Sequence, residues 1–213
     1  MQGSVTLLAG ATMIAELAGL VSIDYEELQE ADLTRLFPQL RKAFGDDPDC
    51  LGIVLVAMQS VPSYASLRKT LLSYASYLAA LPTEELLKLE KPHAKYVVGW
   101  SHGREKLRSG AVDTRKGVCL FQASGLTSGS YYVNPTHEAA VASELMKDMF
   151  PEYTEANIWP SADLLPGFRE TFEELARLIV VVGARLAKVL SHLRGSNIRR
   201  VMHMVCEFEG ACS

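Results

Sequence analysis

One histidine of this sequence lies between two glycines and beside a tryptophan, in the stretch Gly99-Trp100-Ser101-His102-Gly103. An imidazole can bind a metal ion or act as a general base near neutral pH. Both roles need partners, because a metal site has further ligands and a base has a group that orients it. The other interpretation is a turn, in which the imidazole hydrogen-bonds to nearby backbone and the glycines supply unusual dihedral angles. We expect the turn.

Aromatic and amide side chains follow in the stretch S-Y-Y-V-N-P at 130–135. The alternation predicts a strand with one tyrosine facing the core. His137-Glu138 lacks the second histidine of an H-E-x-x-H zinc site, so it fits the start of a helix better. The sequence contains no Walker loop or G-x-G-x-x-G fingerprint. Its four cysteines form no C-x-x-C pair, which is typical of a reduced, cytoplasmic protein.

The composition is that of a globular protein, with 48% apolar and 22% charged residues and a net charge of −4. Lys and Arg are scattered and form no basic stripe, so nucleic acid is not an expected partner. The apolar segment 1–20 has no basic residue before its apolar part, and Glu16 interrupts it. We therefore expect an N-terminal extension or packed helix there, and neither a signal peptide nor a membrane span.

In the first half of the chain, the pattern of apolar and capping residues predicts two strands and three helices. Residues 21–25 alternate like a short strand, and Asp32 is a candidate N-cap for a helix that Pro38 divides and Gly45 ends. The apolar run 51–57 predicts a buried strand. A helix then opens at 61–63, and another begins at 82–85 with a capping Thr83.

The second half predicts strands and loops over 94–135 and a long helix over 167–193. Apolar residues recur along this helix at steps of four and three, which places them on one face and predicts a core helix. This stripe consists of Phe168, Phe172, Leu175, Ile179, Val182, Leu186, Val189 and Leu193.

The order of the motifs resembles the N-terminal half of the non-haem Fe(II) and 2-oxoglutarate-dependent oxygenases, in the isopenicillin N synthase-like and clavaminate synthase-like branch. The resemblance covers roughly 20–193. It rests on A-F-G before the apolar strand, the V-P helix, G-W-S-H-G and K-G, and above all on N-P at 134–135 followed by N-I-W-P at 157–160 and P-G-F-R at 166–169.

The resemblance implies an α+β fold, mostly helical with a few strands, that ends in the long helix and packs against a double-stranded β-helix, the jelly roll. In the family, the jelly roll follows this part and carries an H-x-D/E motif, a distant second histidine and an R-x-S/T motif. Two imidazoles and a carboxylate on one face of Fe(II) leave positions for co-substrate and O₂. In a complete enzyme, Trp100, His102, Tyr131 and Asn134 are the candidates for the mouth of the substrate site.

The iron ligands are absent from this sequence. None of its five histidines has Asp or Glu two residues later, and the R-x-S/T matches at 169–171 and 194–196 lie away from a late strand. We expect no catalytic residue and no cofactor in this chain, although the complete family member would use Fe(II) and 2-oxoglutarate on a small-molecule substrate. The R-x-S/T matches are attributed to chance.

Two departures from the family pattern complete the expected organisation. Residues 118–129 form a probable insertion between K-G and S-Y-Y-V-N-P, and 194–213 form an atypical tail where the jelly roll should begin. Residues 21–193 are expected to be the dioxygenase N-terminal-like domain, and the chain is expected to be a truncated or alternatively spliced form of the complete oxygenase-like protein. The alternative is a non-enzymatic binding or scaffold module. In both cases, the apolar face of helix 167–193 is a candidate for self-association or for a protein partner.

Overall fold

The computed structural model describes residues 19–30, 32–104, 106, 108–112, 129–135 and 144–192. Most of the extension 1–20, residues 118–128 of the insertion, the His137-Glu138 pair and the tail 194–213 lie outside the described residues. The chain divides into a first unit, residues 1–64 with 178–213, and a second unit, residues 65–177. Helices and short strands are mixed, which confirms the expected α+β class.

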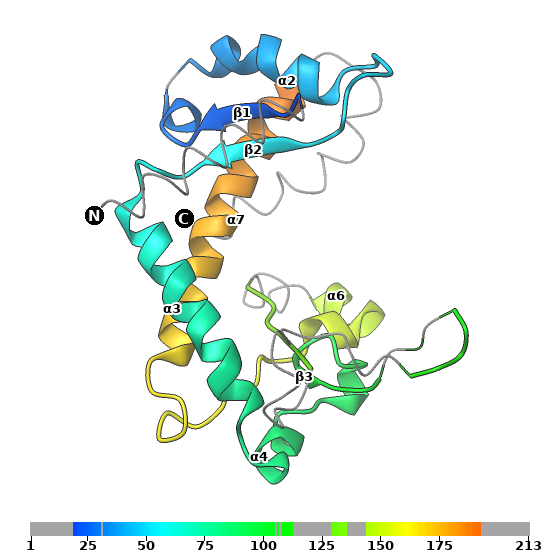
Figure 1. Cartoon of the computed structure of the whole chain (residues 1–213). Helices are drawn as coiled ribbons and strands as arrows, with labels where there is room; N and C mark the ends of the chain where they lie inside the picture. The colour runs from blue at the N-terminus through cyan, green and yellow to red at the C-terminus, as the bar shows by residue number, and fades with distance from the viewer. Residues whose placement is uncertain are drawn as a thin grey trace. The chain divides into compact units, whose positions relative to one another are not determined.

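The elements of the described residues carry the labels of Figure 1. In chain order they are β1 (Val21–Asp24), the 3₁₀ helices η1 (Glu27–Gln29) and η2 (Leu33–Leu36), α2 (Phe37–Phe44), β2 (Val54–Ala57), α3 (Pro62–Ala79), α4 (Thr83–Lys88), the 3₁₀ helix η3 (Pro92–Ala94), β3 (Gly99–Ser101), β4 (Ser130–Tyr132), α6 (Glu144–Met149), the 3₁₀ helix η5 (Pro151–Thr154) and α7 (Phe168–His192).

The first unit is built on a parallel pair of strands, β1 and β2 (Figure 1). Alternate residues of a strand face the same side, and Ile23 and its register partner Val56 face a core that α2 and the end of α7 complete. Ile23, Leu40 and Val189 are each 0% exposed there. Helices therefore cover one face of the two-stranded sheet.

The start and end of α2 follow the local signals of the sequence. The Asp32 carboxylate accepts a hydrogen bond from the Thr34 N–H at 3.1 Å and caps the 3₁₀ turn η2. Pro38 lies in the first turn of α2, where its missing N–H costs no helical hydrogen bond. Gly45 ends the helix, and a Cβ there would lie 2.4 Å from the Arg41 carbonyl oxygen.

The prediction of one buried strand over 51–57 is wrong in its length and its burial. β2 starts only at Val54, because Gly52 has φ +67° and turns the chain. Leu51, Ile53 and Leu55 are 54%, 57% and 37% exposed. The sheet is covered on one face only, so the alternate side chains of this segment remain accessible.

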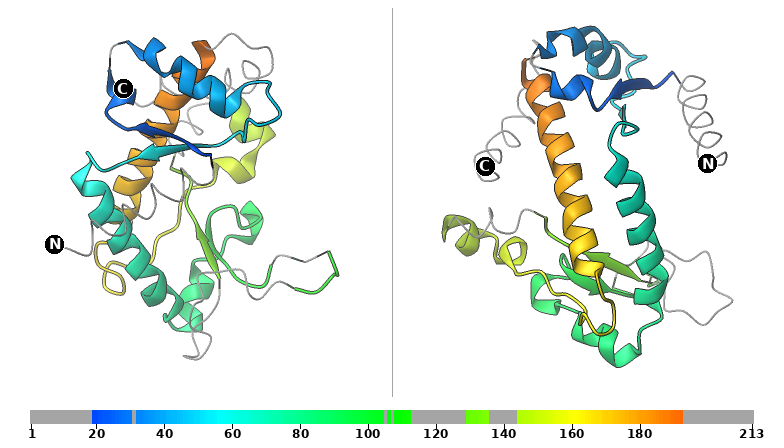
Figure 2. Two further views of the ribbon diagram at one scale, coloured as in Figure 1. Left: turned by 45° about the horizontal axis from the view of Figure 1, so that its top comes forward. Right: turned by 90° about the vertical axis from the view of Figure 1, so that its left-hand side faces the viewer.

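The second unit contains α3, α4, the antiparallel pair β3–β4, α6 and the first part of α7 (Figure 2). Its core cluster has Leu78, Trp100 and Phe168 at 4%, 4% and 3% exposure. The predicted Thr83 cap is not observed. Pro82 occupies the N-cap position of α4 and no side chain caps that helix, although Glu84 and Glu85 lie in its first turn as the helix dipole favours.

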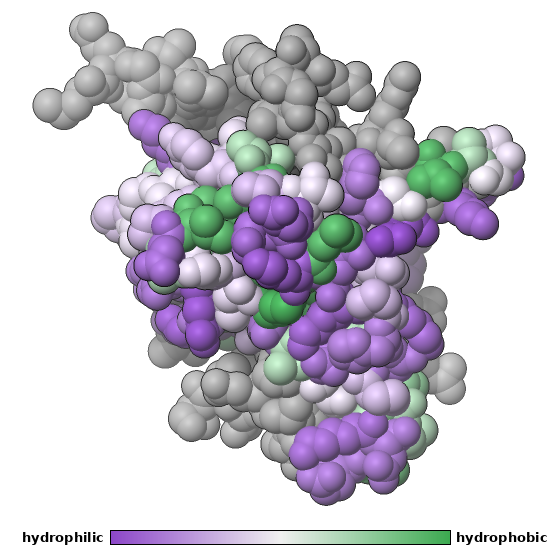
Figure 3. All heavy atoms as spheres, turned by 90° about the horizontal axis from the view of Figure 1, so that it is seen from below, coloured by the Kyte–Doolittle hydropathy of each residue, from purple (hydrophilic) through white to green (hydrophobic). Residues whose placement is uncertain are grey.

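The long predicted helix is confirmed as the 25-residue α7. The apolar stripe is buried towards both ends, where Phe168 and Val189 are 3% and 0% exposed, but Ile179 near its middle is 57% exposed. None of the helices in the described residues is long and apolar enough to cross a membrane. On the face drawn in Figure 3, hydrophilic side chains predominate and hydrophobic residues form small separate groups.

Candidate functional site

Two of the four candidate residues meet across the hairpin-like pair β3–β4. Trp100 and Tyr131 are register partners, and directly opposed residues of an antiparallel pair point to the same face. The Trp100 N–H also donates to the Leu89 carbonyl at 2.9 Å, which ties β3 to the end of α4. Trp100 is 4% exposed, so its indole belongs to the interior of the second unit.

Glycines at two positions allow this packing. Gly99 has φ +80°, and a Cβ there would lie 2.1 Å from the Leu89 carbonyl oxygen. A Cβ on Gly129 would lie 2.3 Å from the Trp100 ring. The indole therefore lies directly against the backbone that leads into β4. Any larger residue at either position would have to displace backbone or the ring itself.

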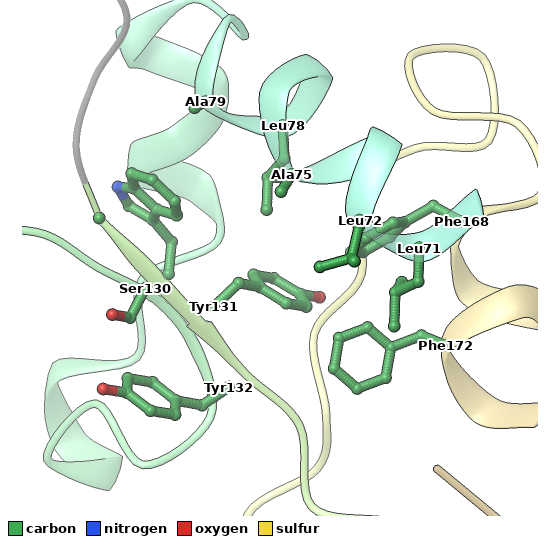
Figure 4. Close-up of a pocket in the computed structure, with 12 residues that line it drawn as sticks. Leu71, Leu72, Ala75, Leu78, Ala79, Ser130, Tyr131, Tyr132, Phe168 and Phe172 are labelled. Carbon is green, nitrogen blue, oxygen red and sulfur yellow. The ribbon is translucent and has the colours of Figure 1, made fainter. Parts of the chain in front are cut away.

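A pocket of about 440 Å³ opens beside this pair (Figure 4). Residues of α3, β3, β4 and α7 form its wall, and all of these lining residues belong to the second unit. None of the lining residues described is charged. The Tyr131 ring points into it, whereas the side chains of Ser130 and Tyr132 point away. The lining residues are Leu71, Leu72, Ala75, Leu78, Ala79, Trp100, Gly129, Ser130, Tyr131, Tyr132, Phe168 and Phe172.

The Tyr131 hydroxyl is held by the protein. It donates a hydrogen bond to the Ile158 carbonyl oxygen, and burial raises the pKa of the phenol above its usual value. A phenol with a raised pKa remains protonated at neutral pH and cannot act as a general base. Tyr131 therefore offers an aromatic face to the pocket, and its polar atom serves the fold.

His102 and Asn134, the other two candidates, do not line the pocket. His102 lies in a bend between β3 and Gly103, which has φ +61°. Positive φ at Gly99 and Gly103 agrees with the turn that the sequence predicts. The four residues therefore do not form one constellation.

Asn134 instead pairs with Asn157, a residue that sequence reasoning noted only as part of a motif. The Asn134 N–H donates to the Asn157 side-chain oxygen at 2.8 Å, and the Asn157 amide donates to the Asn134 carbonyl at 2.9 Å. The Asn134 amide also donates to the Tyr153 carbonyl at 3.0 Å. In the sequence, this pair was indicated only by the two motifs that contain the asparagines, N-P at 134–135 and N-I-W-P at 157–160.

An aromatic cluster continues the wall of the pocket into α7. Tyr131, Trp159 and Phe172 surround Phe168, with ring centroids 5.4, 6.1 and 5.8 Å from it. The rings are steeply inclined to one another, the edge-to-face arrangement that aromatic quadrupoles favour. The Arg169 guanidinium lies over Trp159, 5.6 Å from its centroid.

Ion pairs join the segment after α4 to the segment around η5. Lys91 donates to the Glu155 carboxylate and, at 2.9 Å, to the Ala156 carbonyl, while the His93 Nε2 lies 3.1 Å from Glu155. Lys95 pairs with Glu152. The hydrogen bond from Lys91 holds the pKa of Glu155 below its usual value. These contacts fasten the loop that carries Asn157.

Fe(II) would need ligands that the described residues do not provide. In the part of the chain that the structure describes, no three His, Cys, Asp or Glu side chains are grouped so that they could hold a metal ion. Comparisons with protein-family models, with curated proteins and with solved structures found no match. What the arrangement offers is a rigid aromatic corner, an uncharged pocket and a set of interlocked motif residues.

Proposed function

We propose that this chain forms the N-terminal, non-catalytic part of a cytoplasmic Fe(II)-dependent, 2-oxoglutarate-using oxygenase-like protein. In its complete form, the protein would oxidise a small organic molecule with O₂. The observation that supports the proposal is that the most specific motifs of the resemblance contact one another in space.

The contacts involve the residues by which the motifs are recognised. Asn134 of the N-P motif and Asn157 of the N-I-W-P motif exchange two hydrogen bonds across 23 residues of sequence. Trp159 of the same motif packs on Phe168 of the P-G-F-R motif, with centroids 6.1 Å apart. Tyr131 bonds to the Ile158 carbonyl. These contacts join residues of all three motifs, which supports treating the motifs as parts of one structural unit.

Exposed apolar side chains give further support, because a supporting domain has to bury surface against the domain it supports. Leu51, Ile53 and Leu55 lie along one segment of the first unit and are each more than a third exposed. Ile179 on α7 is 57% exposed. Apolar surface of this kind marks contact areas in proteins. In the proposal, the jelly roll covers it.

The chemistry of the proposal belongs to the jelly roll. There Fe(II), held by two imidazoles and a carboxylate, would activate O₂. Among the described residues, no three His, Cys, Asp or Glu side chains are grouped as such a ligand set requires. In the proposal, the part of this chain is to hold β3, β4 and the start of α7 in one piece.

A non-enzymatic binding or scaffold module is the second candidate. Two features favour it, the uncharged pocket beside Trp100 and the exposed apolar segment 51–55 that leads into β2, since both are typical of binding surfaces. Such a module would use the same fold with no oxygenase partner. The two candidates differ in whether the gene also encodes a jelly roll and in whether the complete protein has oxygenase activity.

Sequencing of full-length transcripts tests the proposal directly. We expect a transcript in which the codons for 118–129 are absent and in which an H-x-D/E motif and a distant histidine follow the codons for α7. The protein translated from it should convert 2-oxoglutarate to succinate only with Fe(II) present, and replacement of the H-x-D/E histidine by alanine should abolish turnover. Transcripts without these codons would contradict the proposal and favour the binding module.

A further inference from the structure

The pocket of the second unit has the size and chemistry of a ligand site that the proposed function does not use. Its volume is about 440 Å³, and the pocket is partly open to solvent. Small-molecule sites generally occupy about 300–1,000 Å³. The pocket therefore falls within the volume range of small-molecule sites.

Small residues on one helix face create the space. Ala75 and Ala79 lie one turn apart on α3, on the face that also carries Leu71 and Leu78. Residues four apart on a helix are neighbours, so the two alanines leave a gap where larger side chains would fill it. Figure 4 shows this part of α3 opposite Tyr131, with the Leu71 and Leu72 side chains lying towards Phe168 and Phe172.

Three polar side chains of the wall are engaged or turned away from the pocket. The Tyr131 hydroxyl is bonded to the Ile158 carbonyl, and the side chains of Ser130 and Tyr132 point away from the pocket. Water inside such a site finds few hydrogen-bond partners on its walls, so an apolar molecule displaces it favourably. A charged ligand would lose hydration without gaining a counter-charge from the described lining residues, which include no Lys, Arg, Asp or Glu.

We propose that this pocket binds an uncharged, flat, apolar molecule of two or three rings. The size follows from the volume, because a cavity of about 150 Å³ accommodates benzene and this pocket is larger. The shape follows from the walls, because the rings of Phe168, Phe172 and Tyr131 offer edges and faces to an aromatic guest. Leu72, 51% exposed, lies at the entrance. The proposal does not depend on the oxygenase assignment.

The test uses a pair of fluorescent probes that differ in one charged group. N-phenyl-1-naphthylamine is neutral, and 8-anilinonaphthalene-1-sulfonate is the same skeleton with a sulfonate. Titration of the purified full chain should give saturable binding of the neutral probe at one site per chain. The sulfonate should bind at least about 10-fold more weakly, the equivalent of about 1.4 kcal/mol. Equal or tighter binding of the sulfonate would overturn the proposal, as would a lack of saturation.

Matched variants on α3 locate the binding. Ala75→Phe places a phenyl ring inside the pocket and should weaken the neutral probe at least about 10-fold. Ala65→Phe makes the same change at an exposed position of the same helix, outside the lining, and should leave the affinity within about twofold. If circular dichroism shows that Ala75→Phe does not fold, the smaller filler Ala75→Leu takes its place with the same expected direction. Unchanged binding in a folded Ala75 variant would refute the site.

Discussion

The reciprocal pair of Asn134 and Asn157 allows a quantitative test of the motif corner. Replacing Asn157 by alanine removes the acceptor of the Asn134 N–H at 2.8 Å and the donor to the Asn134 carbonyl at 2.9 Å. A hydrogen bond of this type contributes about 1 kcal/mol net. Both groups of Asn134 are only partly buried, so water replaces some of what is lost. The expected cost is about 2 kcal/mol of unfolding free energy.

Tryptophan fluorescence during urea denaturation is the appropriate assay. Both tryptophans of the chain, Trp100 and Trp159, belong to the second unit and to its core cluster, so their emission reports the unit that contains the substitution. A loss of about 2 kcal/mol should also lower the melting temperature by about 4–8 °C for a protein of this size.

Two comparison variants make the result specific. Asn157→Asp keeps an oxygen for the Asn134 N–H but loses the donor, so it should fall between wild type and Asn157→Ala. Ser76→Ala, an exposed change on α3, should alter the free energy by no more than about 0.5 kcal/mol. The reasoning is refuted if Asn157→Ala and Ser76→Ala unfold at the same urea concentration.

Three further outcomes follow from other contacts. Gly99→Ala should cost at least about 3 kcal/mol, measured by the same denaturation, because its Cβ would lie 2.1 Å from the Leu89 carbonyl and φ is +80°. The Lys91 ammonium lowers the pKa of Glu155 in the folded state, so this pair stabilises the protein above the unfolded glutamate pKa of about 4.3 and loses that contribution as the pH falls through the folded value. Denaturation at pH 7 and pH 3 should therefore show a deficit for Glu155→Gln that shrinks at pH 3, and an equal deficit at both would contradict the ion pair. Ile179→Lys should reduce any self-association through α7 in sedimentation velocity, and wild-type association that persists in this variant would exclude that face.

Local signals in the sequence were sufficient for most single elements. Asp32 and Gly45 bound the α2 region, and the period of apolar residues defined α7, because caps, glycines and helical periodicity act within a few residues. The alternation at 21–25 likewise defined β1. The burial of β2 was predicted wrongly, since a run of apolar residues does not reveal how many faces of a sheet are covered.

The candidate site was harder to predict because its contacts are distant in sequence. Trp100 and Tyr131 were singled out separately, but their pairing depends on the register of β3 with β4. Asn157 gained its role only when it met Asn134. The pocket depends on Ala75 and Ala79, whose small side chains matter only opposite large rings. No local pattern in a single sequence shows where small side chains will leave a pocket.

The division of the chain has a consequence for the order in which it folds during synthesis. The second unit is contiguous, residues 65–177, whereas the first unit needs both 1–64 and the segment from 178 onward. During synthesis, the second unit is therefore complete before the first unit, because the first unit still lacks its C-terminal segment. This is the reverse of the usual N-terminal-first order. β1, β2 and α2 must wait with their apolar faces open until Val189 and Leu190 emerge to close the core. During that interval the strand pair exposes the apolar side chains that Val189 and Leu190 cover in the folded protein.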